Sequence, residues 1–158
     1  MDLILFQVGE SKETTDKHGN CSVCLTKKGA KTVLTAARGM ARVIPRKLKL
    51  QVWSSVETPS SQTADYIAEE LGVKRKFLRS IDSDDLNSFL EIAFEYAKDD
   101  VLLIVSHHTN VTEWSKKLTG LDLPFVNASA AGLSIDPANP ESGELQWFIQ
   151  PRYLKNIN

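Results

Sequence analysis

Two adjacent histidines follow the most apolar segment of the chain. Residues 101–105 are five consecutive aliphatic residues, and Ser106, His107 and His108 come directly after them. An imidazole at the end of a buried strand, just before a helix, lies where backbone N–H groups and the helix dipole attract an anion. It can also carry a proton near neutral pH. Taken alone, this pattern is more typical of a histidine packed at a strand end, so other loops must support a functional interpretation.

A second set of reactive side chains is His18, Cys21 and Cys24, each separated by two residues. These three side chains could ligate a metal, but no second cysteine pair completes a closed zinc site. A redox Cys-x-x-Cys normally lies between a strand and a helix, and here the nearest predicted strand ends well upstream. We therefore interpret Cys21 and Cys24 as a reduced pair, and we expect no metal and no cofactor.

The apolar pattern predicts strands and helices that alternate along the chain and position these residues. Strands are expected over residues 3–6, 48–53, 101–105, 125–135 and 144–149, with a minor one over 76–78. One helix runs from its N-cap Thr26 to Pro45, and a second starts at the N-cap Thr58 and ends at Gly72. A third is capped within residues 83–85 and reaches 97, and a short fourth ends at Gly120. Residues 10–20 are expected to form a loop.

This alternation predicts an α/β fold with a single domain over residues 1–158. We expect a three-layer α/β/α sandwich whose central sheet is mainly parallel, with antiparallel C-terminal strands at one edge. In such sheets ligands bind outside the carboxyl ends of the strands. The loops after residues 6, 53 and 105 are therefore the places where function is expected.

Charge and hydropathy disfavour several classes of partner. The chain has 19 basic and 20 acidic side chains, a net charge of −1, whereas nucleic-acid-binding domains usually carry a basic excess. The basic clusters 46–49 and 74–76 are interpreted as solvated element edges. The longest strongly apolar run, residues 101–105, is far shorter than the about 20 residues that cross a bilayer. With no recognisable secretory signal, we expect a cytoplasmic protein that binds neither nucleic acid nor membranes.

Three segments together resemble motifs of a known family. Residues 25–29 read Leu-Thr-Lys-Lys-Gly, Ser55 precedes Gln-Thr-Ala at 62–64, and Val105-Ser106-His107 ends the strongest strand. In order and spacing they resemble the histidine phosphatase (phosphoglycerate mutase-like) superfamily, most closely its small phosphohistidine phosphatase branch. That family has Leu-Thr-x-x-Gly, then Ser-Pro-x-x-Arg-Ala-x-Gln-Thr-Ala, then a strand-end histidine. The resemblance covers nearly the whole chain and implies the same α/β fold.

This chain departs from the family pattern at the positions that the family uses for catalysis. The family opens with Arg-His-Gly, whose histidine attacks the phosphoryl group; here the corresponding residues are Gln7, Val8 and Gly9. The arginine of the second block is replaced by Pro59. Val8 has no lone pair and cannot be a nucleophile. Without either arginine, the bidentate guanidinium contacts that hold phosphate are absent as well.

Three hypotheses follow. The first is a pseudo-phosphatase that binds a phosphate-bearing small molecule or a phosphoprotein through Gln7, Gly9, Ser55, Pro59, His107 and His108. The second is a phosphatase or other hydrolase with rewired chemistry, in which His107 or His108 acts as nucleophile or base, helped by Lys27, Lys28 or Arg38. Of the two histidines, His107 is expected to reach the pocket and His108 to lie at the helix start or on the surface. The third is a partner-binding protein, such as a homodimer, whose pocket is vestigial and whose Trp114 or Trp147 serves an interface.

Overall fold

A six-stranded mixed sheet forms the centre of the molecule. The computed structural model describes residues 1–154, and its sheet has the strand order β5-β4-β6-β1-β7-β8. Four strands are parallel: β1 (Asp2–Gln7), β4 (Leu50–Ser54), β5 (Arg75–Phe77) and β6 (Val101–Ser106). The last two, β7 (Ala130–Asp136) and β8 (Asn139–Ile149), are antiparallel and form one edge. The predicted α/β fold with antiparallel C-terminal edge strands is confirmed.

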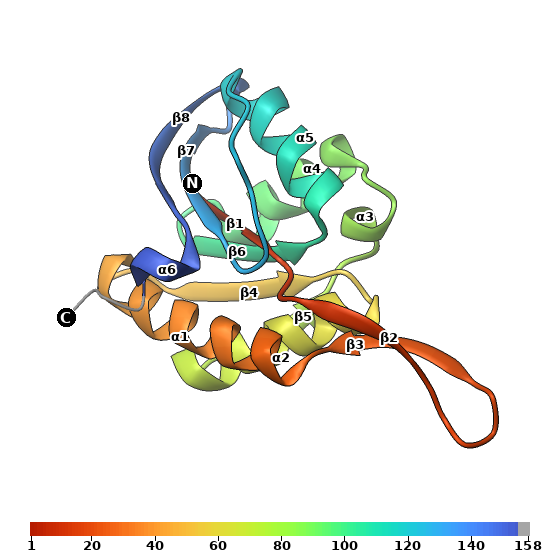
Figure 1. Cartoon of the computed structure of the whole chain (residues 1–158). Helices are drawn as coiled ribbons and strands as arrows, with labels where there is room; N and C mark the ends of the chain where they lie inside the picture. The colour runs from red at the N-terminus through yellow and green to blue at the C-terminus, as the bar shows by residue number, and fades with distance from the viewer. Residues whose placement is uncertain (155–158) are drawn as a thin grey trace.

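Helices cover both faces of this sheet and complete the three layers (Figure 1). On one face lie α1 (Lys27–Val43) and α2 (Thr58–Leu71), and on the other lie α4 (Leu86–Ala97) and α5 (His108–Thr119). Two short helices, α3 (Arg79–Asp82) and α6 (Pro151–Leu154), complete the set. Strand β1 shows why two layers form, because its side chains alternate between the faces. Leu3 and Leu5 pack in the cluster with α4 and α5, and Ile4 and Phe6 pack in the cluster with α1 and α2.

Most helix ends lie where local chemistry predicts them. Thr26 is the N-cap of α1, and its hydroxyl accepts a hydrogen bond of 2.9 Å from the Gly29 backbone N–H. Gly72 and Gly120 follow α2 and α5 with φ of 69° and 75°, the left-handed conformation that favours glycine. The expected N-cap Thr58 is wrong by one residue. Glu57 is the N-cap of α2 and makes no side-chain capping bond, so Thr58 is already in the first turn.

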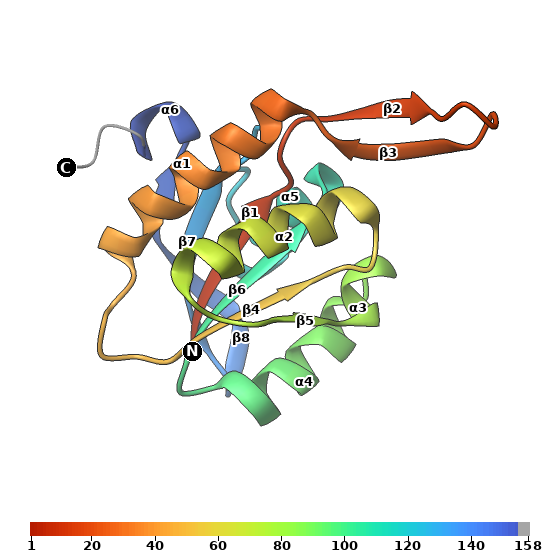
Figure 2. The same cartoon turned by 90° about the horizontal axis from the view of Figure 1, so that it is seen from below.

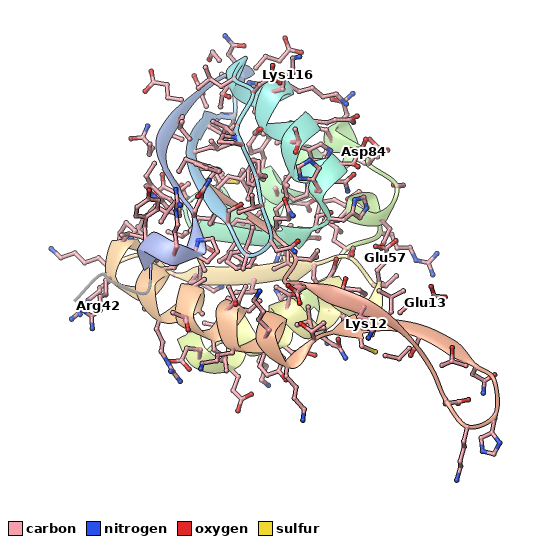
Figure 3. All side chains as sticks on the ribbon, in the orientation of Figure 1. Lys12, Glu13, Arg42, Glu57, Asp84 and Lys116 are labelled. Carbon is pink, nitrogen blue, oxygen red and sulfur yellow. The ribbon has the colours of Figure 1, made fainter. Side chains whose placement is uncertain are left out.

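Residues 10–20, expected to be a loop, contain half of a β-hairpin. Strands β2 (Ser11–Thr15) and β3 (Cys21–Leu25) pair only with each other and project from the domain as an arm (Figures 1 and 2). Lys12 and Glu13 lie on this arm, outside the packed layers (Figure 3). All five β2 side chains are exposed, so the strand has no apolar alternation for a sequence pattern to detect.

The turn of the hairpin is organised by Asp16. Its carboxylate accepts hydrogen bonds from the backbone N–H of His18 at 2.8 Å and of Asn20 at 2.9 Å. These hydrogen bonds, those from Asn20 first, lower the pKa of Asp16 below its ordinary value. Gly19 completes the turn with a φ of 82°. The arm therefore has a defined tip although it contributes nothing to either core cluster.

The remaining differences from expectation lie near strand ends. β7 begins at Ala130 because a turn precedes it, in which Ala128 has a φ of 61° and the Ser129 N–H donates to the Val126 carbonyl at 3.0 Å. β8 begins at Asn139, earlier than expected, and α3 follows the edge strand β5 without having been predicted. Trp114, considered above for an interface, is completely buried, and its indole N–H donates to the Asp84 carboxylate. Within residues 1–154 no helix has the length and apolarity to cross a bilayer.

Candidate functional site

The three loops singled out in the sequence meet at one edge of the sheet. Strands β4, β6 and β1 are neighbours and parallel, with Gln7 opposite Ser106 and Ser54 opposite Val105. Their carboxyl ends therefore lie side by side. Strand β7 runs the other way, so the segment before Ala130 reaches the same edge. We call the residues gathered here the strand-end site: Gln7, Val8, Ser55, His107, His108 and Asn127.

Gln7 is held by hydrogen bonds at both ends of its side-chain amide. The residue is 5% exposed, its Oε1 lies 2.9 Å from Nδ1 of His108, and its Nε2 donates to Oδ1 of Asn127 at 3.1 Å. Since an amide oxygen can only accept, this contact places a proton on Nδ1 of His108. In the neutral imidazole Nε2 is then an acceptor. The expected surface residue His108 is thus exposed but joined to the site, and Asn127 is a member that the sequence did not indicate.

His107 lies between the end of β6 and the first turn of α5. It is the N-cap residue of that helix, with φ −77° and ψ 167°, and its side chain makes no capping bond. The imidazole is half-buried and has no hydrogen-bond partner among residues 1–154. Asn110, one turn further on, fixes the start of the helix by donating to Oγ of Ser106 at 3.0 Å. Both ring nitrogens of His107 are therefore available to a ligand beside a helix N-terminus.

Val8 and Gly9 are fixed by their backbone. The Val8 N–H donates to the Ser106 carbonyl at 3.0 Å, and the Val8 side chain packs against the α1–α2 core cluster. The Gly9 N–H donates to Oγ1 of Thr63 at 3.2 Å. A Cβ on Gly9 would lie 2.7 Å from a methyl carbon of Val33, so only glycine fits here. The Gly9 N–H was expected to contact a ligand, but Thr63 already engages it.

The loop from β4 to α2 contains buried hydroxyl groups without partners. Ser54 and Ser55 are completely buried and Ser60 is nearly so, and no Oγ of the three has a hydrogen-bond partner within the described chain. A buried hydroxyl without a partner carries a cost of about 1–3 kcal/mol. Pro59, at the family's arginine position, is half-buried in the first turn of α2. The loop from β4 to α2 therefore brings buried hydroxyl groups to this side of the site. Pro59 itself has no side-chain group that can donate a hydrogen bond.

The basic residues considered as helpers are engaged or lie apart. Arg38 donates from Nε to Glu70 of α2 at 2.9 Å, which also raises the pKa of the guanidinium, so it is bound on the outer helix face. Lys28 lies 3.8 Å from the Glu10 carboxylate. The side-chain hydrogen bonds at Gln7, His108 and Asn127 join amide and imidazole groups. The described strand-end site therefore has hydrogen-bonding capacity but no guanidinium clamp.

The backbone of β3 places Cys21 and Cys24 too far apart for a disulfide between them. Cys21 and Cys24 lie on one strand, β3, three residues apart. An extended strand separates such Cα atoms by about 10 Å, beyond the about 7 Å that a disulfide can span. Among the described residues there is no group of His, Cys, Asp and Glu side chains that could hold a metal ion. A cavity of about 920 Å³ lies on another part of the surface, where Asp84, Lys117 and Asn139 contribute to its lining.

Comparison with known proteins identifies the fold. No protein-family model matches the sequence, and no curated protein sequence matches it either. The protein histidine phosphatase SixA, solved with tungstate, superposes with a TM-score of 0.75 at 17% identity, covering 98% of this chain and 100% of that one. A mycobacterial glucosyl-3-phosphoglycerate phosphatase solved with inorganic phosphate gives 0.71 at 14% identity, covering 96% and 98% of the two chains.

A third solved structure extends the likeness. Phosphoserine phosphatase from Entamoeba histolytica, solved with 3-phosphoglyceric acid, gives a TM-score of 0.68 at 12% identity, covering 97% and 98% of the chains. The fold of this chain is therefore that of the histidine phosphatases over nearly its whole length. The resemblance predicted from the three segments is confirmed at the level of the fold.

Proposed function

We propose that this chain is a pseudo-phosphatase on the histidine phosphatase fold. In this proposal the strand-end site binds a phosphate-bearing small molecule or a phosphoprotein and does not transfer the phosphoryl group by the family mechanism. The observation that carries the proposal is the engagement of Gln7 by His108 and Asn127 at 2.9 and 3.1 Å. Gln7 occupies the position of a phosphate-binding arginine, and both ends of its amide are already engaged, one by His108 and the other by Asn127.

The chemistry of the neighbouring residues supports the same conclusion. Val8 offers no lone pair for attack, and its backbone N–H and that of Gly9 are engaged within the protein. Loss of a nucleophile alone commonly leaves about 10³–10⁴-fold acceleration over water, supplied by the rest of the site. Here Gln7 and Pro59 remove the charged part of that remainder. We therefore expect no turnover at enzyme-like rates.

Binding would depend on the groups that are still available. His107 has two ring nitrogens without protein partners, and Ser55 has an unpartnered hydroxyl. Together with the N-terminus of α5, His107 would donate hydrogen bonds to phosphoryl oxygens, whereas the buried Ser55 hydroxyl could do so only if the β4–α2 loop moved. Because none of the described residues assigned to the strand-end site has a guanidinium group to offset a dianion, the rest of the ligand must supply part of the affinity. The reduced cysteines fit a cytoplasmic location, which we propose with this function.

Two measurements test the proposal. The purified protein is first incubated with p-nitrophenyl phosphate and with a phosphohistidine peptide. We expect its rate of hydrolysis to be no higher than that of a His107→Ala variant. Val8→His alone should also remain inactive, because Gln7 and Pro59 still provide no cation. Hydrolysis at enzyme-like rates by the unaltered chain would contradict the proposed loss of activity.

Binding is followed by NMR of the imidazole groups, since the chain has only three histidines. Orthovanadate is the probe, and we expect it to shift the ring signals of His107 while leaving those of His18, at the tip of the hairpin, unchanged. His18→Ala provides the matched control for His107→Ala. Equal shifts at both histidines, or none at saturating vanadate, would contradict binding at the strand-end site.

One observation favours a second candidate, a hydrolase with rewired chemistry. Gln7 fixes the ring of His108 with Nδ1 protonated, which leaves Nε2 as a proton acceptor, the arrangement of a general base. His107, half-buried and without a partner, would be the alternative reactive group. If a screen of ester and phosphate substrates reveals an activity, this candidate requires it to fall in His107→Ala or His108→Ala and to persist in His18→Ala.

A further inference from the structure

Two basic clusters that are separate in the sequence meet in the folded chain. Strands β4 and β5 pair in parallel with Val52 opposite Arg75, so the residues just before each strand lie together. A groove of about 340 Å³ lies at these amino ends. We call it the cationic groove, and its lining consists of Lys49, Leu50, Gln51, Val73, Lys74 and Lys76.

The positive charge of the groove is not compensated by ion pairs. Lys49, Lys74 and Lys76 are all exposed, and none lies within 4.0 Å of a carboxylate among residues 1–154. Arg75 adds no unpaired charge to the groove, because its Nε is 2.6 Å from Oδ1 of Asp65. Asp100 accepts a hydrogen bond of 2.7 Å from the groove residue Gln51, and Glu95 and Asp99 line the adjoining hollow with it.

The surrounding sequence extends the positive charge. Residues 27–49 contain eight of the chain's 19 basic side chains and none of its 20 acidic ones. Arg46 and Lys47 belong to this segment and directly precede the groove. Two of the eight, Lys28 and Arg38, are paired with Glu10 and Glu70, so the charge added directly beside the groove is that of Arg46 and Lys47.

An exposed leucine accompanies these cations. Leu48 lies between Lys47 and Lys49 with 40% of its surface exposed. A free phosphate ion would gain nothing from an aliphatic side chain beside it. An anionic bilayer satisfies both features, because its headgroups attract lysines and its acyl boundary accepts an apolar side chain.

Against the expectation from the sequence that the chain binds no membrane, we propose that the cationic groove binds the phosphate headgroups of an anionic lipid bilayer, with Leu48 inserted at the acyl boundary. The groove is at the amino ends of the strands, and the strand-end site is at their carboxyl ends. Figure 3 shows Arg42, near the end of α1, and Glu57, just after β4, on opposite sides of the molecule. Docking through the groove would leave the strand-end site facing solution, so this proposal does not depend on the proposed function.

The test measures partition of the full chain onto vesicles by sedimentation. Phosphatidylcholine vesicles with 30% phosphatidylglycerol are compared with pure phosphatidylcholine vesicles at several NaCl concentrations. Each lysine near an anionic surface contributes about 1 kcal/mol, a factor of about five in affinity. Replacing Lys49, Lys74 and Lys76 by glutamate should therefore weaken partition at least about 100-fold. Leu48→Ser should weaken it by a smaller factor that persists at high salt, where charge interactions are screened.

The matched control carries the same change of charge elsewhere. Lys12→Glu, Lys17→Glu and Lys117→Glu alter exposed lysines on the hairpin and α5, and this variant should keep most of the partition. Circular dichroism confirms that both triple variants are folded. Equal losses in both, or no partition of the unaltered chain onto anionic vesicles, would overturn the proposal. It would also be overturned if inorganic pyrophosphate or duplex DNA bound the groove more tightly than the vesicles did.

Discussion

The hydrogen bond from Gly9 to Thr63 provides the sharpest test of how the strand-end site is built. Thr63 is completely buried in α2, and its Oγ1 accepts from the Gly9 N–H at 3.2 Å, across 54 residues of sequence. Thr63→Val keeps the shape of the side chain and removes only the acceptor. The buried N–H of Gly9 would then have no partner, which costs about 1–3 kcal/mol. In a domain of this size each kcal/mol lowers Tm by about 2–4 °C.

We therefore expect Thr63→Val to unfold about 2–12 °C below the unaltered chain, with Thr63→Ser close to it because the hydroxyl is retained. Thermal unfolding followed by circular dichroism gives the shift. Amide hydrogen exchange locates it, since the Gly9 amide should lose protection in the valine variant while amides of β6 keep theirs. A valine variant as stable as the serine variant, with a protected Gly9 amide, would refute the assignment of this hydrogen bond.

Two further predictions concern the base of the hairpin and the start of α4. Gly29→Ala should destabilise the fold by about 1–3 kcal/mol in urea denaturation, because the added Cβ would meet the Glu10 backbone carbonyl. An unchanged denaturation midpoint would show that the Gly29 Cα and the Glu10 carbonyl lie further apart than this. Hydrogen bonds from the Ser88 hydroxyl and backbone N–H lower the pKa of Asp85 below its ordinary value. The stability that the Asp85 carboxylate contributes is present above that ordinary pKa and is lost as the pH falls through the lower pKa of the folded state. The Tm difference between the unaltered chain and Asp85→Ala should therefore narrow at low pH. A difference that stays constant down to about pH 2 would contradict this linkage.

The sequence predicts the fold well where burial leaves a periodic pattern. Strand β6 is completely buried and reads as a continuous aliphatic run, and Thr26, Gly72 and Gly120 mark helix ends through local backbone chemistry. The hairpin strand β2 could not be found in this way, because a period of two requires one buried face. Its threonine residues, which favour strands, were the available signal.

The composition of the site is less predictable than its location. Parallel strand ends located Gln7, Ser55 and His107 correctly, because the carboxyl ends of adjacent strands must share an edge. The contact between Gln7 and His108, and the participation of Asn127, depend on side-chain rotamers and on a loop about 120 residues away from Gln7 in sequence. The cationic groove illustrates the same limit, since clusters 25 residues apart became one surface only through the pairing of β4 and β5.

The hairpin arm lies outside the folded core, so its surface can vary independently of the core. Both of its strands leave from the base formed by Glu10 and Thr26, where the Thr26 N–H donates to the Glu10 carbonyl at 3.0 Å. Beyond that base the β2 side chains are exposed and belong to neither core cluster, so substitutions there leave the core contacts unchanged. The first strand of the arm starts at Ser11, four residues after Gln7 of the strand-end site. A lineage could therefore alter what approaches this edge of the sheet while keeping the same scaffold, which makes the arm the evolvable part of the molecule.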